Sequence, residues 1–583
     1  MGRASRTVRE SVVEGSMTRR QVLEALSGLL LGMFVSILAN TVVSTSLPLI
    51  LSDLKGSQSA YTWVVTATLL ATTVSTPIWG KFADLFNRKL LIQLALAVFV
   101  IGSALAGLSQ DAGTLIAFRV VQGLGAGGLV ALSQIIMADI ISPRERGRYA
   151  GLFGAVMALG TIGGPLLGGV VTDAFGWRWN FFIALPVAIV AILLLQRTLH
   201  LPPRVKRVVR IDYLGAALIT SGVSLLLIWV TLAGSQFEWM SVTSFAMLIG
   251  AVVLLIAAVM VEFRAPEPII PLSLFRNHTF SLSTVASLAV GVSLFGTSVF
   301  LSQYMQLARG ATPTQSGLLT IPMMGGLLIS STFFGTLISR RGTWKSIMVS
   351  GSVLMLVGTT LLGTLDVNTS LVFVGVYMFI LGAGVGMVMQ NLVLVVQNTI
   401  EVRHLGVATS SVTFFRSLGG AVGVSVMGSV LGSVVATQIT SGVGRLNPAN
   451  QADAGRLLGD GVIPQVNQLP DVLRIIVESA YGSGVGTIFL ISAPLALVTL
   501  VMVSCLPNNP LGMETGIDRA RGAVVDSDST PESTLQREVE DVEDILIEVS
   551  AASAGVPPVG RAHDTQSIHV VPSSETSRTG HDE

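Results

Sequence analysis

Runs of about 20 predominantly apolar residues recur along most of the chain, separated by short polar connections. An α-helix needs about 20 such residues to cross the hydrocarbon core of a bilayer, so each run predicts one membrane-spanning helix. The pattern therefore predicts an all-α polytopic membrane protein with about fourteen transmembrane helices. The runs lie near 24–51, 61–80, 90–108, 114–140, 150–172, 181–197, 213–233, 241–262, 279–307, 315–339, 346–365, 371–399, 406–437 and 485–505.

Composition agrees with this pattern. Only 12% of the 583 residues are charged, and 51% are hydrophobic. Soluble proteins carry about 25% charged residues, so this chain has too little polar surface to cover a water-soluble body. The single cysteine, Cys505, excludes an internal disulfide and a cysteine-based metal site.

Basic residues are distributed unevenly between the two sides of the predicted helices. Every second connection carries Lys and Arg, whereas the short connections between them carry only Lys55, Arg178 and Arg309. Because basic connections tend to stay in the cytoplasm, we expect both termini to be cytoplasmic and the protein to lie in the plasma (bacterial inner) membrane. The basic connections contain Lys81, Arg88, Lys89, Arg144, Arg146, Arg148, Arg197, Arg204, Lys206, Arg207, Arg210, Arg264, Arg276, Arg340, Arg341, Lys345 and Arg403.

The predicted helices form two groups of six, and the two simpler helices between these groups look like an insertion. The last segment is rich in Ser, Asp, Glu and Pro, a composition typical of disorder. The expected segments are 1–22 (cytoplasmic N-terminal segment), 23–200 (first six-helix bundle), 201–265 (two inserted linker helices), 266–506 (second six-helix bundle, with an external loop at 438–484) and 507–583 (disordered cytoplasmic tail).

Two distant stretches of the chain share a register of glycines. At one offset, four glycines of GRYAGLFGAVMALGTIGGPLLGG, which starts at Gly147, fall on four glycines of GVATSSVTFFRSLGGAVGVSVMG, which starts at Gly406. The same offset places QGLGAGG (122–128) over LGAGVGM (381–387). Chance similarity of apolar runs explains this register less well than an internal repeat does. Two similar multi-helix halves are typical of alternating-access carriers.

The connection GKFADLFNRK (80–89) combines a carboxylate with basic residues. Asp84 can accept hydrogen bonds from a helix N-terminus or from an arginine, and Arg88 offers a partner of opposite sign. Such a cluster can hold one conformation and be released in another. The alternative is a basic loop that only sets topology, and this alternative leaves Asp84 without a role.

At these residues the chain resembles the major facilitator superfamily. GKFADLFNRK is similar to its loop signature, RVVQGLGAGG (119–128) to its helix 4 motif, and GTIGGPLLGG (160–169) to the helix 5 motif of exporters. WRWNFFIALP (177–186) and PEPIIPLSLFRN (266–277) resemble the fourteen-helix drug:proton antiporter branch. The resemblance covers about residues 20–505. It implies the major-facilitator fold, with two six-helix halves plus two inserted helices, and a multidrug efflux activity.

Helix 4 carries two candidate coupling residues. Inserting an arginine into lipid costs about 2.5–3.5 kcal/mol, so Arg119 should face the bundle interior with a partner. The resemblance implies a role for Arg119 in proton coupling, and a structural arginine bonded to carbonyls is the alternative. Gln122, a candidate for the substrate cavity, lies one turn away on a similar side. Asp139 ends the helix, where it either pairs with Arg146 or Arg148 or acts as a protonatable gate.

Helix 5 carries small residues on one face. Gly160, Gly164 and Gly168 are spaced by four, and Pro165 removes one backbone hydrogen bond. This face permits close packing, and a neighbouring helix can slide against it. The stretch therefore predicts a conformational hinge.

Helix 1 carries a polar stripe. Ser36, Asn40 and Ser44 are spaced by four, which predicts either a cavity wall or interhelical hydrogen bonds. In the fourteen-helix branch an aspartate usually stands where this chain has Asn40, and an amide does not titrate. Either proton coupling has then moved to Asp139, Asp84 or Glu24, or the coupling differs from the family's usual form.

In the second half, Arg416 needs a buried partner by the same argument as Arg119. Gln390 and Asn391 are the other candidates for contact with substrate.

Three functions are compatible with these observations. The first is a secondary active exporter of amphipathic or cationic small molecules, driven by a proton gradient without a cofactor. The second is an exporter of lipids or cell-envelope precursors, and the third is a receptor or assembly protein on the same fold. The absence of GxxxxGK[ST], HExxH and GxSxG motifs argues against ATP, against a metal site and against an enzyme. The expected partners are small amphipathic molecules and the lipid bilayer, with no nucleic acid, and we expect a monomer.

Overall fold

A computed structural model describes residues 19–54, 58–199, 212–234, 236–311, 313–447, 451, 454 and 469–519. Within these ranges the regular structure is helical, apart from an isolated bridge between Ala233 and Phe237. The predicted N-terminal segment up to residue 18, the connection 201–211 and the tail from residue 520 lie outside the described residues.

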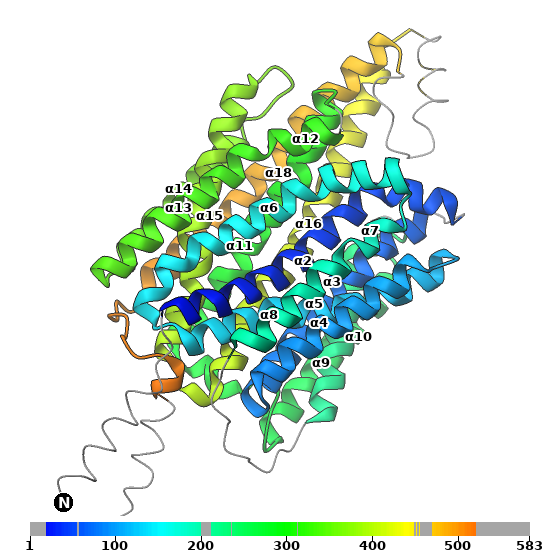
Figure 1. The fold of residues 1–583 in the computed structure, drawn as a ribbon. Coiled ribbons are helices and arrows are strands. Elements are labelled where there is room, and N and C mark those ends of the chain that lie inside the picture. Colours follow the sequence, from blue (N-terminus) through cyan, green and yellow to red (C-terminus); the bar gives the residue numbers. More distant parts are fainter. Residues whose placement is uncertain are drawn as a thin grey trace, which may run out of the picture. The chain divides into compact units, whose positions relative to one another are not determined.

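The first half of the bundle contains seven helices (Figure 1). These are α2 (Arg19–Asp53), α3 (Gln58–Leu85), α4 (Arg88–Gly107), α5 (Ala112–Ile140), α6 (Pro143–Phe175), the short α7 (Trp179–Phe182) and α8 (Ala184–Thr198).

The inserted pair and the second half follow. The pair is α9 (Tyr213–Leu232) and α10 (Val242–Arg264). The second half contains η1 (Leu272–Arg276), α11 (His278–Gln303), η2 (Tyr304–Ala308), α12 (Pro313–Leu319), α13 (Ile321–Arg341), α14 (Lys345–Leu362), α15 (Leu371–Thr399), η3 (Val402–His404), α16 (Leu405–Val443) and α18 (Asp471–Cys505).

Among the described residues, 12 helices are long and apolar enough to cross a membrane. The long helices α3 and α6 are outside this group, although both pack within the bundle. The all-α polytopic fold is therefore confirmed, whereas a count of fourteen spanning helices stays a prediction.

Local signals explain where several helices begin and end. Asn87, Asp111, Ser241 and Asn277 precede α4, α5, α10 and α11, and each side chain accepts a hydrogen bond from a backbone N–H in the first turn. This is the usual role of Asn, Asp and Ser at a helix start. Gly342 ends α13 with φ 73°, a left-handed conformation that favours glycine.

The glycine register predicted an internal repeat, and the packing agrees with it. A Cβ on Gly125 of α5 would lie 2.5 Å from the backbone N of Phe99 in α4. A Cβ on Gly384 of α15, the equivalent position, would lie 2.6 Å from the backbone N of Met355 in α14. Both positions therefore need glycine, because real Cβ atoms essentially never come so close to backbone. Equivalent helix pairs, α4 with α5 and α14 with α15, therefore pack closely in the two halves.

The helix contacts repeat as well. In the first half α5 packs on α3 and α4, and α2 packs on α6. In the second half α15 packs on α13 and α14, and α11 packs on α16. The main contacts between the halves are those of α6 with α13 and of α16 with α3. These two contacts are equivalent, because α13 is the counterpart of α3 and α16 is the counterpart of α6. A two-fold arrangement of two related halves follows.

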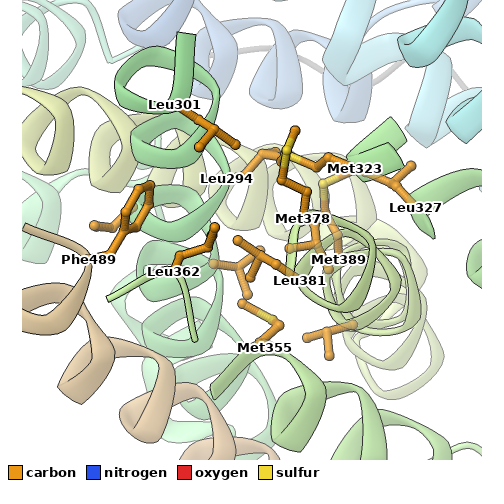
Figure 2. Packing of buried hydrophobic residues seen from close by; sticks show 14 of the residues in the cluster. Leu294, Leu301, Met323, Leu327, Met355, Leu362, Met378, Leu381, Met389 and Phe489 are labelled. Carbon is orange, nitrogen blue, oxygen red and sulfur yellow. The ribbon is translucent and has the colours of Figure 1, made fainter. Parts of the chain in front are cut away.

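Methionine fills much of the apolar core of the second half (Figure 2). Met323, Met355, Met378 and Met389 lie among leucines of α11, α13, α14 and α15. Unbranched thioether side chains adapt to irregular gaps between helices, so this core tolerates small changes in helix packing.

The inserted helices α9 and α10 pack on each other, and α9 also contacts α3 of the first half and α16 of the second. Two carboxylates secure the chain that follows. Glu262 accepts hydrogen bonds from the N–H groups of Ile269 and Ile270, both at 3.2 Å. Glu267 pairs with the buried Lys81 at 2.8 Å. The chain that follows the insertion is thus attached to α3 near its end.

Two predicted segments need correction. The expected loop at 438–484 is shorter, because α16 continues to Val443 and α18 begins at Asp471. The polar residues at the start of α18 pair along the helix, with Arg474 lying 3.2 Å from Asp471 and 3.7 Å from Glu478. Residues 507–519 of the expected disordered tail pack on the bundle, and the remainder of that tail lies outside the described residues.

Candidate functional site

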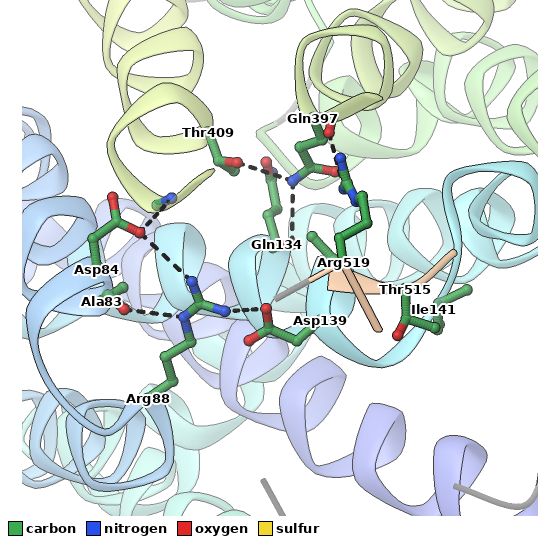
Figure 3. A network of polar contacts seen from close by, with 12 residues as sticks. Ala83, Asp84, Arg88, Gln134, Asp139, Ile141, Gln397, Thr409, Thr515 and Arg519 are labelled. Atoms are coloured by element: carbon green, nitrogen blue, oxygen red, sulfur yellow. Dashed lines mark hydrogen bonds and ion pairs between the residues drawn. The ribbon is translucent and has the colours of Figure 1, made fainter. Parts of the chain in front are cut away.

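The end of the bundle that carries the connections 86–87, 141–142 and 342–344 is called the basic end below, after the Lys and Arg residues beside them. At this end, side chains of both halves form a polar network in two parts, one around Arg88 and one around Gln397 (Figure 3). We call this network the polar gate. It consists of Asp84, Arg88, Gln134, Asp139, Arg146, Gln397, Thr409 and the first backbone N–H groups of α16.

The Asp84 carboxylate, at the end of α3, lies at the N-terminus of α16. It accepts hydrogen bonds from the backbone N–H groups of Gly406 at 2.8 Å and Val407 at 2.9 Å. A helix N-terminus presents unpaired N–H groups and a partial positive charge, both of which favour a carboxylate. A Cβ at residue 406 would lie 2.5 Å from both this carboxylate and the Gly80 carbonyl, so only glycine permits the approach.

Arg88 connects Asp84 to Asp139. Its guanidinium lies 3.5 Å from Asp84, forms an ion pair with Asp139, and donates from Nε to the Ala83 carbonyl at 3.0 Å. Arg88 is 4% exposed, so the two carboxylates compensate a buried charge. The structure thus brings together three of the five residues predicted to act in coupling or gating.

The partner of Asp139 differs from the one considered in the sequence. Neither Arg146 nor Arg148 forms a described ion pair with it. Arg146 instead donates to the carbonyls of Ala138 at 2.8 Å and Ile141 at 2.9 Å, and to the Gln397 side chain of α15. The physical reason is local geometry, because Arg146 lies in the first turn of α6 and turns back over the backbone carbonyls at the C-terminal end of α5.

Gln397 is the centre of the second part of the gate. Its Nε2 donates to Thr409 Oγ1 at 3.0 Å and to the Gln134 carbonyl at 3.4 Å. Gln134 Oε1 in turn accepts from Thr413 at 3.4 Å. These contacts join α5 and α6 of the first half to α15 and α16 of the second.

The segment 507–519, which follows α18, crosses the gate. Asn398 of α15 donates to the Pro510 carbonyl at 3.0 Å and accepts from the Gly512 N–H at 2.8 Å. The Gly512 carbonyl accepts from the N–H of Arg144, in the first half, at 3.2 Å. Arg519 donates to the Gln397 carbonyl at 3.2 Å. This segment therefore binds both halves where they meet.

A cavity of about 630 Å³ opens at the basic end, and Asp139 is part of its wall. The first turn of α2, the α5–α6 connection, the end of α13 and the segment 507–519 enclose it. Asp139 thus lies between the Arg88 guanidinium and a space at the surface.

Arg119 and Gln122 are both buried, away from the gate. Arg119 donates to Gln122 Oε1 at 2.7 Å and to the Val64 carbonyl at 3.4 Å. Gln122 donates to Ser103, which donates to the Phe181 carbonyl at 2.9 Å. The chain links α3, α4, α5 and α7 within the first half, an arrangement that agrees with a structural arginine.

The other first-half candidates lie apart. Asn40 is half-buried and donates to the Ser36 carbonyl, one turn earlier, at 3.0 Å. Glu24 pairs with Arg20 at 2.8 Å on the exposed start of α2. The side chain of Ser44 lies outside the described residues.

The glycines of α6 face α2 of the same half. A Cβ on Gly160, Gly164 or Gly168 would meet Ile37, Thr41 or Val42 respectively within 3 Å. The Gly160 carbonyl accepts a hydrogen bond from Thr41 at 2.9 Å. The close face is thus packed within the first half, and the side chain of Pro165 lies outside the described residues.

Gln390 and Asn391 line a small cavity between α5, α6 and α15, just inside the gate. Its volume of about 20 Å³ leaves no room for an organic substrate while the gate is closed. Asn391 donates to the Met387 carbonyl at 2.7 Å. Arg416 is buried on α16, and its Nη1 has no partner among the described residues.

Gln134 and Thr409 of the gate were not singled out in the sequence. Gln134 is an amide within an apolar helix, and this polarity was the available signal. Gln397 and Asn398 stand out in the sequence by the same signal, as amides near the cytoplasmic end of an apolar run. Among the described residues, no group of three or more His, Cys, Asp and Glu could hold a metal ion.

The chain matches the Major Facilitator Superfamily model over residues 29–424. An uncharacterized MFS-type transporter of Mycobacterium tuberculosis (strain ATCC 25618 / H37Rv) is 35% identical over 531 residues, which cover 89% of this chain and 74% of the relative. The multidrug transporter protein MdtP of Bacillus subtilis (strain 168) is 34% identical over 457 residues, which cover 78% and 80%.

Solved structures give the same fold. The human organic anion transporter MFSD10 (TETRAN) superposes with a TM-score of 0.57 over 84% of this chain and 100% of its own, at 17% identity. At this identity the likeness concerns the fold alone. The family model and the two relatives show, beyond the fold, the superfamily to which the chain belongs. The chain therefore belongs to the major facilitator superfamily, and it is a multi-pass membrane transporter rather than an enzyme.

Proposed function

We propose that this transporter is a secondary active exporter of amphipathic small molecules, which works by proton antiport and alternating access. The observation that carries the proposal is the polar gate. Charged and amide side chains of one half bind backbone and side-chain groups of the other at the basic end of the bundle. Such a contact holds one arrangement of two halves and must break for the other.

The basic end is proposed to face the cytoplasm, because its connections carry most of the Lys and Arg. Both termini then lie on the cytoplasmic side of the plasma membrane, which is the inner membrane in a bacterium. With the gate closed at this end, the described conformation corresponds to a state closed to the cytoplasm. The two related halves supply both sides of the gate within one chain, so a monomer suffices.

Asp139 is the proposed proton site. A proton reaching the 630 Å³ cavity meets Asp139 in its wall. Protonation removes the negative charge opposite Arg88, and a buried guanidinium that loses one of two anionic partners is strongly destabilised. The Asp84–Arg88 contact and the α16 N-terminus would then separate more easily. In this scheme Asn40 contributes no proton, since an amide does not titrate.

The driving force is sufficient for accumulation against a gradient. One proton that moves down 100 mV releases about 2.3 kcal/mol, which corresponds to somewhat under two powers of ten in substrate concentration. The names of two relatives, MdtP and Multidrug resistance protein 3 of Bacillus subtilis, support efflux of drug-like compounds as the cargo class.

The test is accumulation of fluorescent amphipathic dyes in a pump-deficient bacterial host. Expression should lower accumulation, and a protonophore should restore it. Asp139→Asn should behave like the empty vector, whereas Asp111→Asn, which changes an exposed helix cap, should behave like the wild type. Equal accumulation with and without the transporter, over a broad panel of compounds, would refute the proposal.

A further inference from the structure

Arg416 lies deep in the membrane-spanning part of α16. At a rise of 1.5 Å per residue it is about 16 Å from the first residue of that helix, close to half of a hydrocarbon core of about 30 Å. Arg416 is 7% exposed, and its Nη1 is buried without a hydrogen-bond partner. Its side chain forms no ion pair with any described residue.

Neighbouring positions show where the side chain is directed. Residues seven apart on a helix lie about 20° from each other around the axis, so Thr409 and Gly423 share the face of Arg416. Thr409 accepts from Gln397 of α15 at 3.0 Å, and a Cβ on Gly423 would lie 2.6 Å from Val292 of α11. Arg416 therefore points into the bundle, one to two turns beyond the gate.

At this depth the described helices supply no carboxylate. In the described spanning helices, every Asp and Glu lies within about two turns of a helix end. Asn40 of α2 is an amide, and Arg119 adds a second buried positive charge that is bonded to Gln122. The interior between the gate and the opposite end therefore carries positive charge that no described side chain compensates.

A buried guanidinium without a partner is unfavourable, and an incoming anion removes this penalty. Guanidinium also binds carboxylate and phosphate oxygens through two parallel hydrogen bonds, which adds specificity. Fixed positive charge in the same space disfavours a cationic ligand.

We propose that Arg416 binds the anionic group of the transported molecule, and that this exporter accepts amphipathic anions and zwitterions in preference to cations. The inference rests on the proposed export function and replaces the cationic cargo expected from the sequence. The ligand group is a carboxylate, sulfonate or phosphate attached to an apolar body.

The test uses three probes that share one fluorescent apolar body and end in a carboxylate, its methyl ester or a primary amine. Binding to the purified full-length protein is measured by fluorescence anisotropy, and uptake into inside-out proteoliposomes is measured under a proton gradient. The wild type should bind and transport the carboxylate best. Arg416→Gln should weaken carboxylate binding about tenfold or more, as expected for a lost charge-assisted hydrogen bond, and should leave the ester unchanged.

Arg416→Lys keeps the charge but not the fork of two donors, so its affinity should lie between the other two. Arg474→Gln, at an exposed ion pair of α18, is the matched control and should bind like the wild type. Preference for the amine, or carboxylate binding that is unchanged in Arg416→Gln, would overturn the inference. Arg416-dependent binding of the carboxylate without gradient-driven uptake of any probe would support the anion site and count against proton-driven export.

Discussion

The Asp84 carboxylate of α3 and the Gly406 N–H of α16 meet at 2.8 Å, although 322 positions separate them in the chain. One residue belongs to each half of the bundle, and the glycine at 406 is required for the approach. This contact joins the two halves through one carboxylate at a helix N-terminus.

Asp84→Asn should shift the protein toward a state that is open at the basic end. The amide is neutral and can accept through only one atom, so it holds the α16 N-terminus less well, by about 0.3–1 kcal/mol or more for a buried site. Spin labels at two exposed positions of the basic end, Leu90 on α4 and Arg341 on α13, report the change after Cys505→Ser removes the native thiol. The distance between the labels should lengthen, and an unchanged distance distribution would contradict the gate.

Asp139→Asn should abolish uphill transport and preserve downhill exchange. The amide binds no proton, so the concentration ratio of substrate should fall from somewhat under two powers of ten per 100 mV toward unity. Flux measured in proteoliposomes with and without a pH gradient separates the two modes. A variant that still concentrates substrate would move proton coupling to another residue.

Truncation distinguishes two parts of the C-terminal region. Removal of residues 520–583 should leave the gate intact, because the described contacts of this region end at Arg519. Removal of residues 507–583 should destabilise the closed gate, since each lost hydrogen bond contributes about 0.5–1.5 kcal/mol. Asn398→Ala, which removes two of these bonds, should reproduce part of the effect in thermal unfolding and label-distance measurements. Equal stability of both truncated chains would show that the segment 507–519 does not hold the gate.

Gly125→Ala and Gly384→Ala should destabilise equivalent helix pairs in the two halves. A methyl group at either position would come within about 2.6 Å of a backbone atom, and such overpacking typically costs about 1–3 kcal/mol. Gly163→Ala is the control, since its Cβ would meet nothing within 4 Å. Thermal unfolding in detergent, followed by circular dichroism, should show a lower midpoint temperature for Gly125→Ala and for Gly384→Ala. The midpoint temperature of Gly163→Ala should be unchanged or slightly higher.

The repeat and the helices follow from the sequence, because hydrophobic length, basic connections and the glycine register are properties of local segments. The loop motif also predicted that Asp84 would bind either a helix N-terminus or an arginine. The structure has it bind both, and the helix in question belongs to the other half. The resemblance to a known family located most of the relevant residues but not their partners.

Partner choice was decided by tertiary structure. Asp139 binds Arg88 rather than the nearby Arg146, Arg146 reaches Gln397, and the segment 507–519 packs on the gate although its composition suggested disorder. Each of these outcomes depends on how helices from different parts of the chain are rotated and cross, which periodicity along one helix does not encode. For the same reason the sequence showed that Arg416 needs a partner, and only the structure showed that no described side chain supplies one.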